Sequence, residues 1–535
     1  MLENQQRSLK KYLIPLEKTG LFSPLFLDFA AQRLNQFSGF SSSVAGVREF
    51  CESGYYAQIN RGLLQEEFKK QAEGILLTEK SIENIKLLGN EHTFTVTTGH
   101  QLCLATGPLY FIFKIISAIN ICEHLNTVLG ANKFVPVYWM ASEDHDAEEI
   151  SAIHLFSKEV KWQTAQTGCV GAFRLSDLAE FLNELEKLLG ASENAIQMMV
   201  MMREAYTKNT LAEATRFLVN SLFGKYGILI LDGNSAGLKK QFKEEFRKDI
   251  FHQLSHNKVT ETGEILLSKG YHLQVTPREI NTFLIGEKER GRIVLKNGKF
   301  EVLGMEKQFT HSEMDAIIEQ HPEKLSPNVV LRPLYQQKIL PNAVYTGGPG
   351  ELAYWLQYKA MFAAYQISFP VLIPRNSILY IPESISEKMK KSEFETDDLF
   401  KSPDIFFRKQ LLKKKEYAID EMEQKLAELY GAFKRIVEAE DATLGDAVEA
   451  ELQKAGKGLA MVHQKLLRSL KRKDEEMTAR VTLLFKELLP EGGLAERKVN
   501  FLQYQIRFPD FINVIKKESG TWFQNQGILV LREEA

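Results

Sequence analysis

Two short polar segments carry the residue types that could bind a phosphate group and activate a carboxylate. The first is Gly99–Gln101, and the second is Ser142–Asp146. Each follows an apolar run rich in β-branched and aromatic residues, which is typical of a buried parallel strand: Phe94–Thr98 and Phe134–Met140. Because ligands in an open α/β sheet bind outside the carboxyl ends of the strands, we expect the two segments to meet at one edge of a sheet.

His100 is the first catalytic candidate. Its imidazole could donate a hydrogen bond to a phosphate group as negative charge builds up in the transition state. The alternative is a histidine that caps the turn or the following helix. Its position at a strand end, between Gly99 and Gln101, favours the functional role. We therefore predict that Gly99 and Gln101 contact the same ligand.

The acidic segment supplies three more catalytic candidates, Glu143, Asp144 and His145. They could bind Mg²⁺ together with a nucleotide, bind the amino group of a substrate, or hold a zinc ion, and a solvated acidic turn is the alternative. Mg²⁺ prefers carboxylate and phosphate oxygens. Zinc would need more nitrogen or sulfur ligands than this segment contains, so we predict no metal held by the protein alone.

Two glycine turns that open helices are candidates for nucleotide binding. Gly107 lies in the first turn, and Gly347 and Gly348 lie in the second, between Tyr345 and Glu351. Glycine lets the backbone approach a ligand closely, and a helix N-terminus attracts anions. The alternative for the second turn is glycine that serves only a positive φ. We predict that all five residues belong to the nucleotide site.

Arg375 and Asn376 follow another apolar strand, Phe369–Pro374. The guanidinium group of Arg375 could pair with a phosphate or a substrate carboxylate. Arg332 and Lys338 are further candidates for this role.

The elements that must position these residues alternate between strand and helix. Apolar residues three and four positions apart between Leu109 and Cys122 predict a buried helix after the first strand, and Gly227–Gly233 reads as a further strand. Neither G-x-x-x-x-G-K-[ST] nor G-x-G-x-x-G occurs. We predict an α/β fold, a Rossmann-like nucleotide-binding core with inserted α+β segments. The core spans residues 1–384, with a helical lead-in and insertions at about 151–220 and 234–330; a single helix is expected over about 196–224.

Residues 385–490 are expected to form an antiparallel coiled-coil hairpin that bends near Leu444. Apolar residues follow heptad spacing on both sides of the bend: Ile419, Met422, Leu426, Leu429, Phe433 and Ile436, then Leu459, Val462, Leu466, Leu470, Met477, Val481, Leu484 and Leu488. The seam could be covered within the hairpin or by a partner, and we expect a homodimer. Residues 491–535 should pack back on the body.

Composition limits the class of function. The 535 residues carry a formal net charge of −2 at pH 7, which gives no electrostatic reason to expect nucleic-acid or membrane binding. No apolar run is long enough to cross a bilayer, and the N-terminus lacks the apolar segment of a signal peptide. The four cysteines are scattered, which favours a reducing cytoplasm.

The motifs TTGHQ, TGPLY, SEDHDAEEI, SPNVVLRPLYQQKILP, YTGGPGELAYW and FPVLIPRNS resemble the BshC family of bacillithiol biosynthesis. The resemblance covers nearly the whole chain, including the coiled coil. It implies a Rossmann-like core related to class I aminoacyl-tRNA synthetases. His100 would stand where those enzymes keep a histidine–glycine–histidine signature, and Arg375 where they place a mobile lysine loop; only one of those histidines and no such lysine loop is present.

Two hypotheses of different classes follow. The resemblance implies a cytoplasmic ligase that uses ATP, with Mg²⁺, to add L-cysteine to the amine of glucosaminyl malate through an acyl phosphate or acyl adenylate, releasing ADP or AMP. The second hypothesis is a nucleotide-binding regulator or scaffold whose coiled coil is the working surface.

Overall fold

The computed structural model describes residues 9–54, 58–407, 419–520 and 527–534. Contacts divide the chain into two units. We call Lys11–Leu379 with Ala495–Leu531 the core unit, and Met1–Lys10, Tyr380–Leu494 and Arg532–Ala535 the coiled-coil unit.

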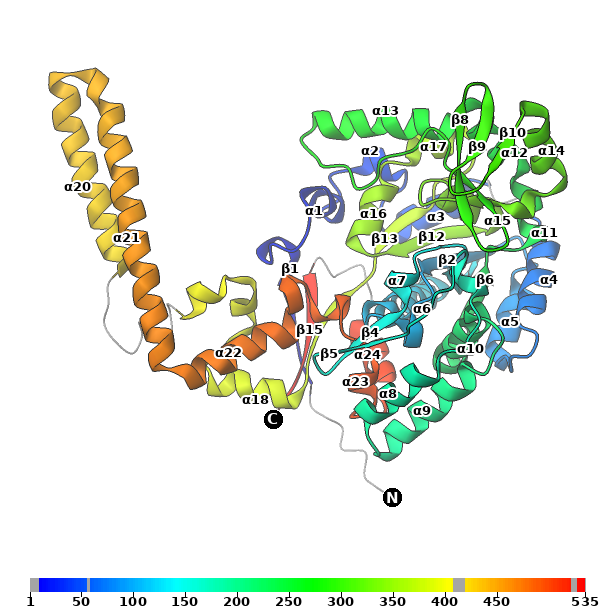
Figure 1. The fold of residues 1–535 in the computed structure, drawn as a ribbon, viewed down its shortest axis with the longest axis horizontal. Coiled ribbons are helices and arrows are strands. Elements are labelled where there is room, and N and C mark those ends of the chain that lie inside the picture. Colours follow the sequence, from blue (N-terminus) through cyan, green and yellow to red (C-terminus); the bar gives the residue numbers. More distant parts are fainter. Residues whose placement is uncertain (1–8, 55–57, 408–418, 521–526, 535) are drawn as a thin grey trace. The chain divides into compact units, whose positions relative to one another are not determined.

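A five-stranded parallel sheet forms the centre of the core unit, in the order β13-β12-β2-β3-β6 (Figure 1). The strands are β2 (Thr93–His100), β3 (Lys133–Met140), β6 (Leu229–Asp232), β12 (Asn342–Gly347) and β13 (Val371–Pro374). The predicted Rossmann-like α/β fold is confirmed. His100, Met140, Asp232 and Gly347 end their strands on the same edge because all five strands are parallel.

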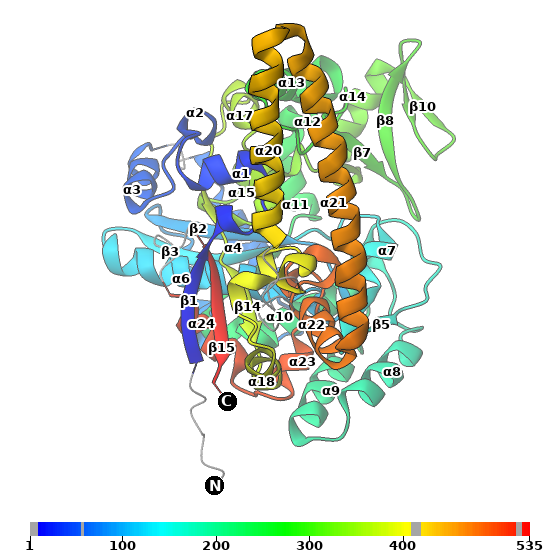
Figure 2. The ribbon, with the colours of Figure 1, turned by 90° about the vertical axis from the view of Figure 1, so that its left-hand side faces the viewer.

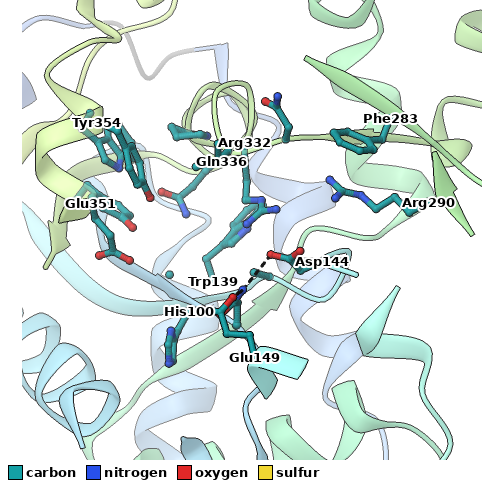
Figure 3. Close-up of a pocket in the computed structure, with 18 of the residues that line it drawn as sticks. His100, Trp139, Asp144, Glu149, Phe283, Arg290, Arg332, Gln336, Glu351 and Tyr354 are labelled. Atoms are coloured by element: carbon teal, nitrogen blue, oxygen red, sulfur yellow. Dashed lines mark hydrogen bonds between the residues drawn. The ribbon is translucent and has the colours of Figure 1, made fainter. Parts of the chain in front are cut away.

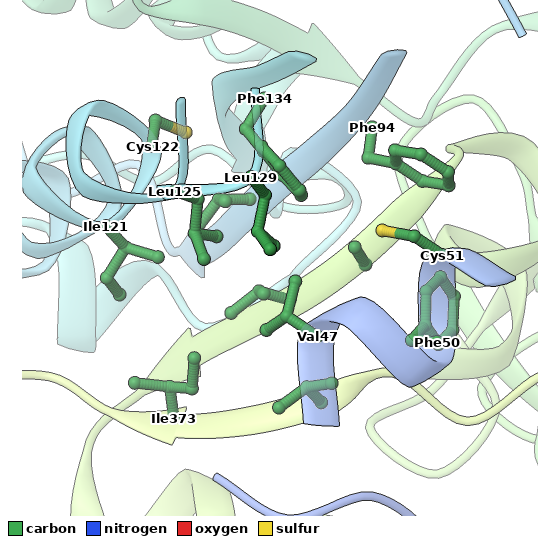
Figure 4. Packing of buried hydrophobic residues seen from close by; sticks show 14 of the residues in the cluster. Val47, Phe50, Cys51, Phe94, Ile121, Cys122, Leu125, Leu129, Phe134 and Ile373 are labelled. Atoms are coloured by element: carbon green, nitrogen blue, oxygen red, sulfur yellow. The ribbon is translucent and has the colours of Figure 1, made fainter. Parts of the chain in front are cut away.

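Helix α6 (Tyr110–Val128) connects β2 to β3 and is buried over most of its circumference. Its C-terminal half packs in an apolar cluster with α3 (Val44–Glu52) and the central strands (Figure 4). Phe94 of β2 and Phe134 of β3 stack in this cluster with ring centroids 5.9 Å apart. The strands are apolar because helices cover both faces of the sheet. The polar residues that follow each strand lie at the edge of the sheet.

Over its described residues, the chain forms three further sheets and a set of helices. A second sheet is antiparallel, in the order β10-β9-β8-β7-β11; its strands are β7 (Thr282–Ile285), β8 (Arg290–Lys296), β9 (Lys299–Val302), β10 (Lys307–Phe309) and β11 (Leu325–Pro327). Smaller sheets pair β4 (Ala152–Leu155) with β5 (Lys158–Lys161), and β1 (Leu9–Pro15) with β15 (Gly527–Glu533) and β14 (Ser377–Ile381). The remaining helices are α1 (Pro24–Ala30), α2 (Asn35–Ser38), α4 (Arg61–Gln71), α5 (Glu79–Leu87), α7 (Ala147–Ile150), α8 (Ala179–Leu189), α9 (Glu193–Ala205), α10 (Leu211–Phe223), α11 (Ala236–Lys239), α12 (Lys243–His252), α13 (Leu254–Ser268), α14 (His311–Gln320), α15 (Arg332–Ile339), α16 (Pro349–Trp355), α17 (Lys359–Ala364), α23 (Leu502–Gln505) and α24 (Phe511–Ser519).

The prediction of a single helix over residues 196–224 is wrong. The segment is divided between α9 and α10. Thr210 adopts an extended conformation, and its side chain accepts a hydrogen bond from the backbone N–H of Glu213. This is an N-cap, which begins a new helix where the apolar periodicity alone indicated continuity.

In the coiled-coil unit, α20 (Ile419–Glu440) and α21 (Gly445–Lys473) form an antiparallel hairpin (Figures 1 and 2). Lys434 pairs with Glu449 at 3.4 Å across the hairpin, and Val448 is buried. The unit also contains α18 (Glu383–Lys391) and α22 (Glu475–Leu488).

The first heptad seam is mostly uncovered within the hairpin. Leu426 is half-buried, but the described side chains of Met422, Leu429, Phe433 and Ile436 are 53–66% exposed. We call these four residues the α20 stripe. Ile419 and Leu470, also predicted in the seams, have side chains outside the described part of the chain.

The second seam does not continue along one helix. Its last four residues are buried on α22, a separate helix whose N-terminus is capped by the side chain of Asp474. These residues are Met477, Val481, Leu484 and Leu488. The sequence pattern could not distinguish these outcomes, because heptad spacing marks an apolar face without saying which surface covers it.

Candidate functional site

A cavity of about 470 Å³ opens at the carboxyl ends of β2, β3 and β12 in the core unit (Figure 3). Its size is in the usual range for a small-molecule site. Five charged and six aromatic residues line it: Asp144, Glu149, Arg290, Arg332 and Glu351, with Tyr110, Trp139, Phe283, Tyr345, Tyr354 and Trp355. Gly99, His100 and Gln101 line it as well, so the structure brings together the first predicted turn and part of the acidic segment.

The imidazole of His100 lies against Tyr110 and Phe111, with ring centroids 5.2 Å apart in each case. Its Nε2 atom is buried and has no hydrogen-bond partner among the described residues. Burial lowers the pKa of His100 well below its usual value, and the charges of Lys114 and Arg375 lower it further. The ring is therefore neutral at pH 7, and the hydrogen-bonding capacity of Nε2 is unused among the described residues.

Gln101 joins two carboxylates at the cavity wall. Its Nε2 donates to Oε2 of Glu149 at 2.6 Å and to Oδ2 of Asp144 at 3.3 Å. Burial would raise the pKa of Asp144, but Arg332, the Gln101 amide, the backbone N–H of His145 and Arg290 together lower it below its usual value. Asp144 therefore stays anionic at neutral pH and can bind a substrate ammonium group. Glu149, four residues beyond the predicted catalytic cluster, was missed because a glutamate in a short helix carries no distinctive signal.

The other two acidic-segment candidates do not line the cavity. Glu143 is buried and pairs with the buried ammonium of Lys239 at 2.5 Å. His145 is exposed, and its Nδ1 lies 3.2 Å from Nη1 of Arg290. The prediction that Glu143 and His145 act directly on substrate is not supported by these positions, since consecutive residues of a turn project in different directions.

Buried Lys114 supports the first turn from beneath the cavity lining. Its ammonium group donates to the backbone carbonyl of Gly99 and to Oε1 of Glu351, the latter at 2.5 Å. Burial lowers the pKa of Lys114, although Glu351 opposes this shift. Tyr345 stacks on Trp355 at 4.4 Å between centroids. Tyr345 and Glu351 thus line the cavity as predicted for ligand-binding residues.

The second glycine turn has a different physical basis from the one predicted. Gly348 has φ −75°, so its backbone needs no left-handed conformation. A β-carbon at Gly348 would lie 3.6 Å from Nε of Arg375, an ordinary contact, whereas one at Gly347 would lie 2.8 Å from Oε2 of Glu351. Neither glycine is a cavity-lining residue. The absence of a side chain at Gly347 leaves room for the carboxylate of Glu351, which accepts a hydrogen bond from the N–H of Gly348.

The prediction that Arg375 is available to a phosphate is wrong. Nη2 of Arg375 pairs with Oε1 of Glu496 at 2.7 Å, and both side chains are buried. Asn376 is also buried, with its N–H donating to Oγ of Ser117 at 3.1 Å. Glu496 belongs to the C-terminal segment, 121 positions away, so no local pattern around Arg375 could reveal this partner.

The predicted anion site beside Gly107 is covered by the same segment. The N–H of Leu109 donates to the carbonyl of Val499 at 2.7 Å, and Nδ2 of Asn500 donates to the carbonyl of Gly107 at 2.7 Å. Gly107 has φ +68°, and a β-carbon there would lie 2.5 Å from that of Cys103. Gly107 therefore shapes the turn and does not contact a ligand in the cavity.

The cationic wall of the cavity was largely missed. Arg332 and Gln336 lie one helical turn apart on α15, and the described structure gives no side-chain hydrogen bond to Arg332. The buried Oε1 of Gln336 likewise has no partner among the described residues. Arg290 enters from β8 and lies over Phe283, 4.2 Å from the ring centroid (Figure 3). Arg332 was predicted as a further candidate, but no motif marks Arg290 on β8 or Gln336 on α15 as binding residues.

Two absences apply to the described ranges. No group of three or more His, Cys, Asp or Glu side chains is placed to hold a metal ion. None of the helices there is both long enough and apolar enough to span a membrane.

Comparisons with known proteins relate the chain to one family over most of its length. A family model described as the N-terminal Rossmann-like domain of bacillithiol biosynthesis BshC matches residues 9–376. A second, described as the C-terminal coiled-coil domain of BshC, matches residues 378–529.

Individual relatives carry the same name, "Putative cysteine ligase BshC". The protein of Flavobacterium psychrophilum is 38% identical, over 94% of this chain and 96% of its own. That of Cytophaga hutchinsonii is 38% identical over 92% of this chain and 94% of its own. The Bacillus cereus protein is 25% identical over 83% of this chain and 86% of its own.

The neutral state of His100 predicts a pH effect on stability. Below about pH 6.5 the unfolded chain binds a proton at this residue, while the folded chain does not, so the free energy of unfolding falls as pH decreases. His100→Gln removes this contribution. We expect the Tm of the variant to fall less than that of the wild type between about pH 7 and about pH 5. His92→Gln, at an exposed histidine, is the control. Equal losses in the wild type and His100→Gln would refute the assignment.

The glycine turn gives a paired prediction. Gly347→Ala should displace Glu351 and weaken ligand binding measured by calorimetry, because the new β-carbon would lie within 3.0 Å of two side chains. Gly348→Ala should bind as the wild type does, since its contact is at 3.6 Å. The opposite ranking of the two variants would contradict this account of the turn.

Proposed function

Because the chain belongs to the BshC family of bacillithiol biosynthesis, we propose that it is an ATP-dependent ligase that joins L-cysteine to glucosaminyl malate through an amide bond. The observation that carries the proposal is the cavity at the strand ends, where anionic and cationic walls face each other (Figure 3). Such a cavity suits substrates with both ammonium and carboxylate groups.

The reaction forms a bond between the carbonyl carbon of cysteine and the amine nitrogen of glucosaminyl malate. One carboxylate oxygen of cysteine leaves with phosphate, and the attacking amine loses a proton. A carboxylate does not acylate an amine unaided at neutral pH, and ATP supplies the activation. The protein's contribution is to align the two substrates and stabilise the charge that develops.

The charged residues divide the cavity between the substrates. We place the ammonium group of cysteine beside Asp144 and Glu149, which Gln101 holds together. We place the carboxylates of the malate moiety beside Arg332 and Arg290, because these carboxylates persist through the reaction and need lasting cationic partners.

The fit to a nucleotide rests on His100. His100 lines the cavity beside Gly99, and its buried Nε2 has no partner in the described structure. A neutral imidazole there can donate a hydrogen bond to a phosphate oxygen. Mg²⁺ bound mainly through phosphate needs only one protein carboxylate, which Glu149 could supply while Asp144 remains the partner of the cysteine ammonium group.

We also propose that the protein is a homodimer formed through its hairpin. The α20 stripe is apolar and exposed, and Met461 and Val462 of α21 are 59% and 63% exposed. A second copy would present the same apolar surface, and two antiparallel hairpins can bury such surfaces against each other as a four-helix bundle.

The ligase proposal is tested by incubating the pure protein with ATP, L-cysteine and glucosaminyl malate and detecting the thiol product by mass spectrometry. Arg332→Ala should lower kcat/KM for glucosaminyl malate by about tenfold to a hundredfold, as expected when a hydrogen-bonded charge partner is lost. Arg203→Ala, which removes an exposed ion pair with Glu186, should leave kcat/KM unchanged. The absence of product with wild-type protein and all three substrates would overturn the proposal.

The dimer is tested by Leu429→Glu combined with Phe433→Glu. Two carboxylates on the stripe should convert the dimer to monomer in sedimentation experiments at micromolar concentration, because charge cannot be buried there without a partner. Ala427→Glu, at an exposed position outside the stripe, should remain dimeric. A wild-type monomer, or a double variant that stays dimeric, would defeat the proposal.

A further inference from the structure

A buried carboxylate lies behind the cationic wall of the cavity. Asp249 of α12 has no exposed surface. Its Oδ2 accepts hydrogen bonds from the backbone N–H of Asn281 and the hydroxyl of Thr282, both at 2.8 Å. Burial raises the pKa of Asp249 to about 6, even though Thr282, Ser255 and Asn281 donate hydrogen bonds to it. Burying a carboxylate is costly, so its presence behind a binding site points to a specific task.

A series of hydrogen bonds connects Asp249 to Arg332. Asn281 accepts a hydrogen bond at Oδ1 from Nδ2 of Asn328, at 3.0 Å, and its carbonyl accepts one from the N–H of Asn328, also at 3.0 Å. Oδ1 of Asn328 in turn accepts from the N–H groups of Val330 and Leu331 at 2.8 and 3.2 Å. The N–H of Arg332 donates to the carbonyl of Asn328 at 2.8 Å. Asn328 thus fixes the start of α15, from which Arg332 enters the cavity.

A second connection leads from Asp249 to Arg290 through strands β7 and β11. Thr282 precedes Phe283 on β7, and Phe283 pairs with Ser326 of β11. Oγ of Ser326 accepts from Nε of Arg290 at 3.0 Å, and the guanidinium group lies over the Phe283 ring. The two arginines of the cationic wall come from different elements, α15 and β8, and each is connected to Asp249 through the contacts described above.

We propose that Asp249 is a positioning residue that sets the separation and direction of Arg332 and Arg290 for the malate carboxylates of the substrate. The assignment of that substrate rests on the proposed function, whereas the connection from Asp249 to the two arginines rests only on the hydrogen bonds and the pairing of β7 with β11. Asp249 lines no part of the cavity and touches no reacting atom. Its effect is transmitted through Asn281 to Asn328 and through Thr282 to Phe283.

The connection from Asp249 to the two arginines is tested by a crystal structure of the Asp249→Ala variant. The variant lacks the carboxylate that accepts hydrogen bonds from Asn281 and Thr282, so we expect Asn281 and Asn328 to change hydrogen-bond partners. The guanidinium groups of Arg332 and Arg290 should then move relative to Trp139. Superimposable arginines in the variant and the wild type would overturn the proposal, whether or not the protein is a ligase. If Asp249→Ala does not fold, Asp249→Asn, which keeps the shape but cannot accept every donor, is used for the same comparison.

The functional consequence is tested by kinetics. Asp249→Ala should raise KM for glucosaminyl malate by about tenfold to a hundredfold, as small misplacements of binding groups do, with a much smaller change in KM for cysteine and in kcat. Asn328→Ala should act similarly, and the double variant should be less impaired than the product of the two effects, because both changes break one chain.

Glu67→Gln supplies the matched control. Glu67 is a buried carboxylate on α4 that does not line the cavity. It should lower Tm without separating the two KM values. Equal rises in KM for both substrates in Asp249→Ala, or full additivity with Asn328→Ala, would contradict the positioning role. A lack of turnover in the wild type would instead refute the proposed function and leave the decision on Asp249 to the crystal structures.

Discussion

The buried ammonium group of Lys114 is the interaction on which the site depends. It joins the carbonyl of Gly99, at the end of β2, to the carboxylate of Glu351, at the start of α16. These groups belong to the two strand–turn–helix segments on which the cavity is built. A charge this deeply buried is tolerated only when it is paired and hydrogen-bonded, so removal of Glu351 would leave an uncompensated charge next to the cavity. The close approach of Glu351 to Gly347 is part of the same arrangement.

Negatively and positively charged residues on facing walls of the cavity come from different elements of the fold. The anionic wall comes from the segment after β3, with Asp144 and Glu149. The cationic wall comes from α15 and β8, with Arg332 and Arg290. Because the walls belong to separate elements, their charges face each other across the cavity and do not all neutralise one another locally. A zwitterionic or dicarboxylate ligand can thus be oriented as well as bound.

The C-terminal segment gives the back of the site its rigidity. Glu496 pairs with Arg375, while Val499 and Asn500 bond the turn around Gly107. Ala105, Thr106 and Gly107 all have positive φ in this turn, a conformation that costs free energy for the two non-glycine residues and persists because neighbouring groups hold it. The turn around Gly107 is therefore covered, whereas Gly99, His100 and Gln101 line the cavity.

The sequence by itself determined the parallel sheet, the buried helix after β2 and the position of His100. Apolar runs and their polar ends are local signals, and a parallel sheet must bring its carboxyl ends to one edge. It also indicated the family, because long motifs occur in the right order. Heptad spacing indicated the hairpin helices for the same local reason.

Only the tertiary structure decided which candidate side chains reach the cavity. Arg375 and Glu143 were reasonable by type and spacing, but Glu496 and Lys239, distant in sequence, neutralise them. Arg290 has no motif and enters the site because β8 pairs beside β7. Likewise, the exposure of Phe433 depends on which face α20 turns to α21. Which charges pair and which helix face is covered depend on residues far apart in the sequence. A local sequence pattern shows the type of each residue but not the residues that it will contact.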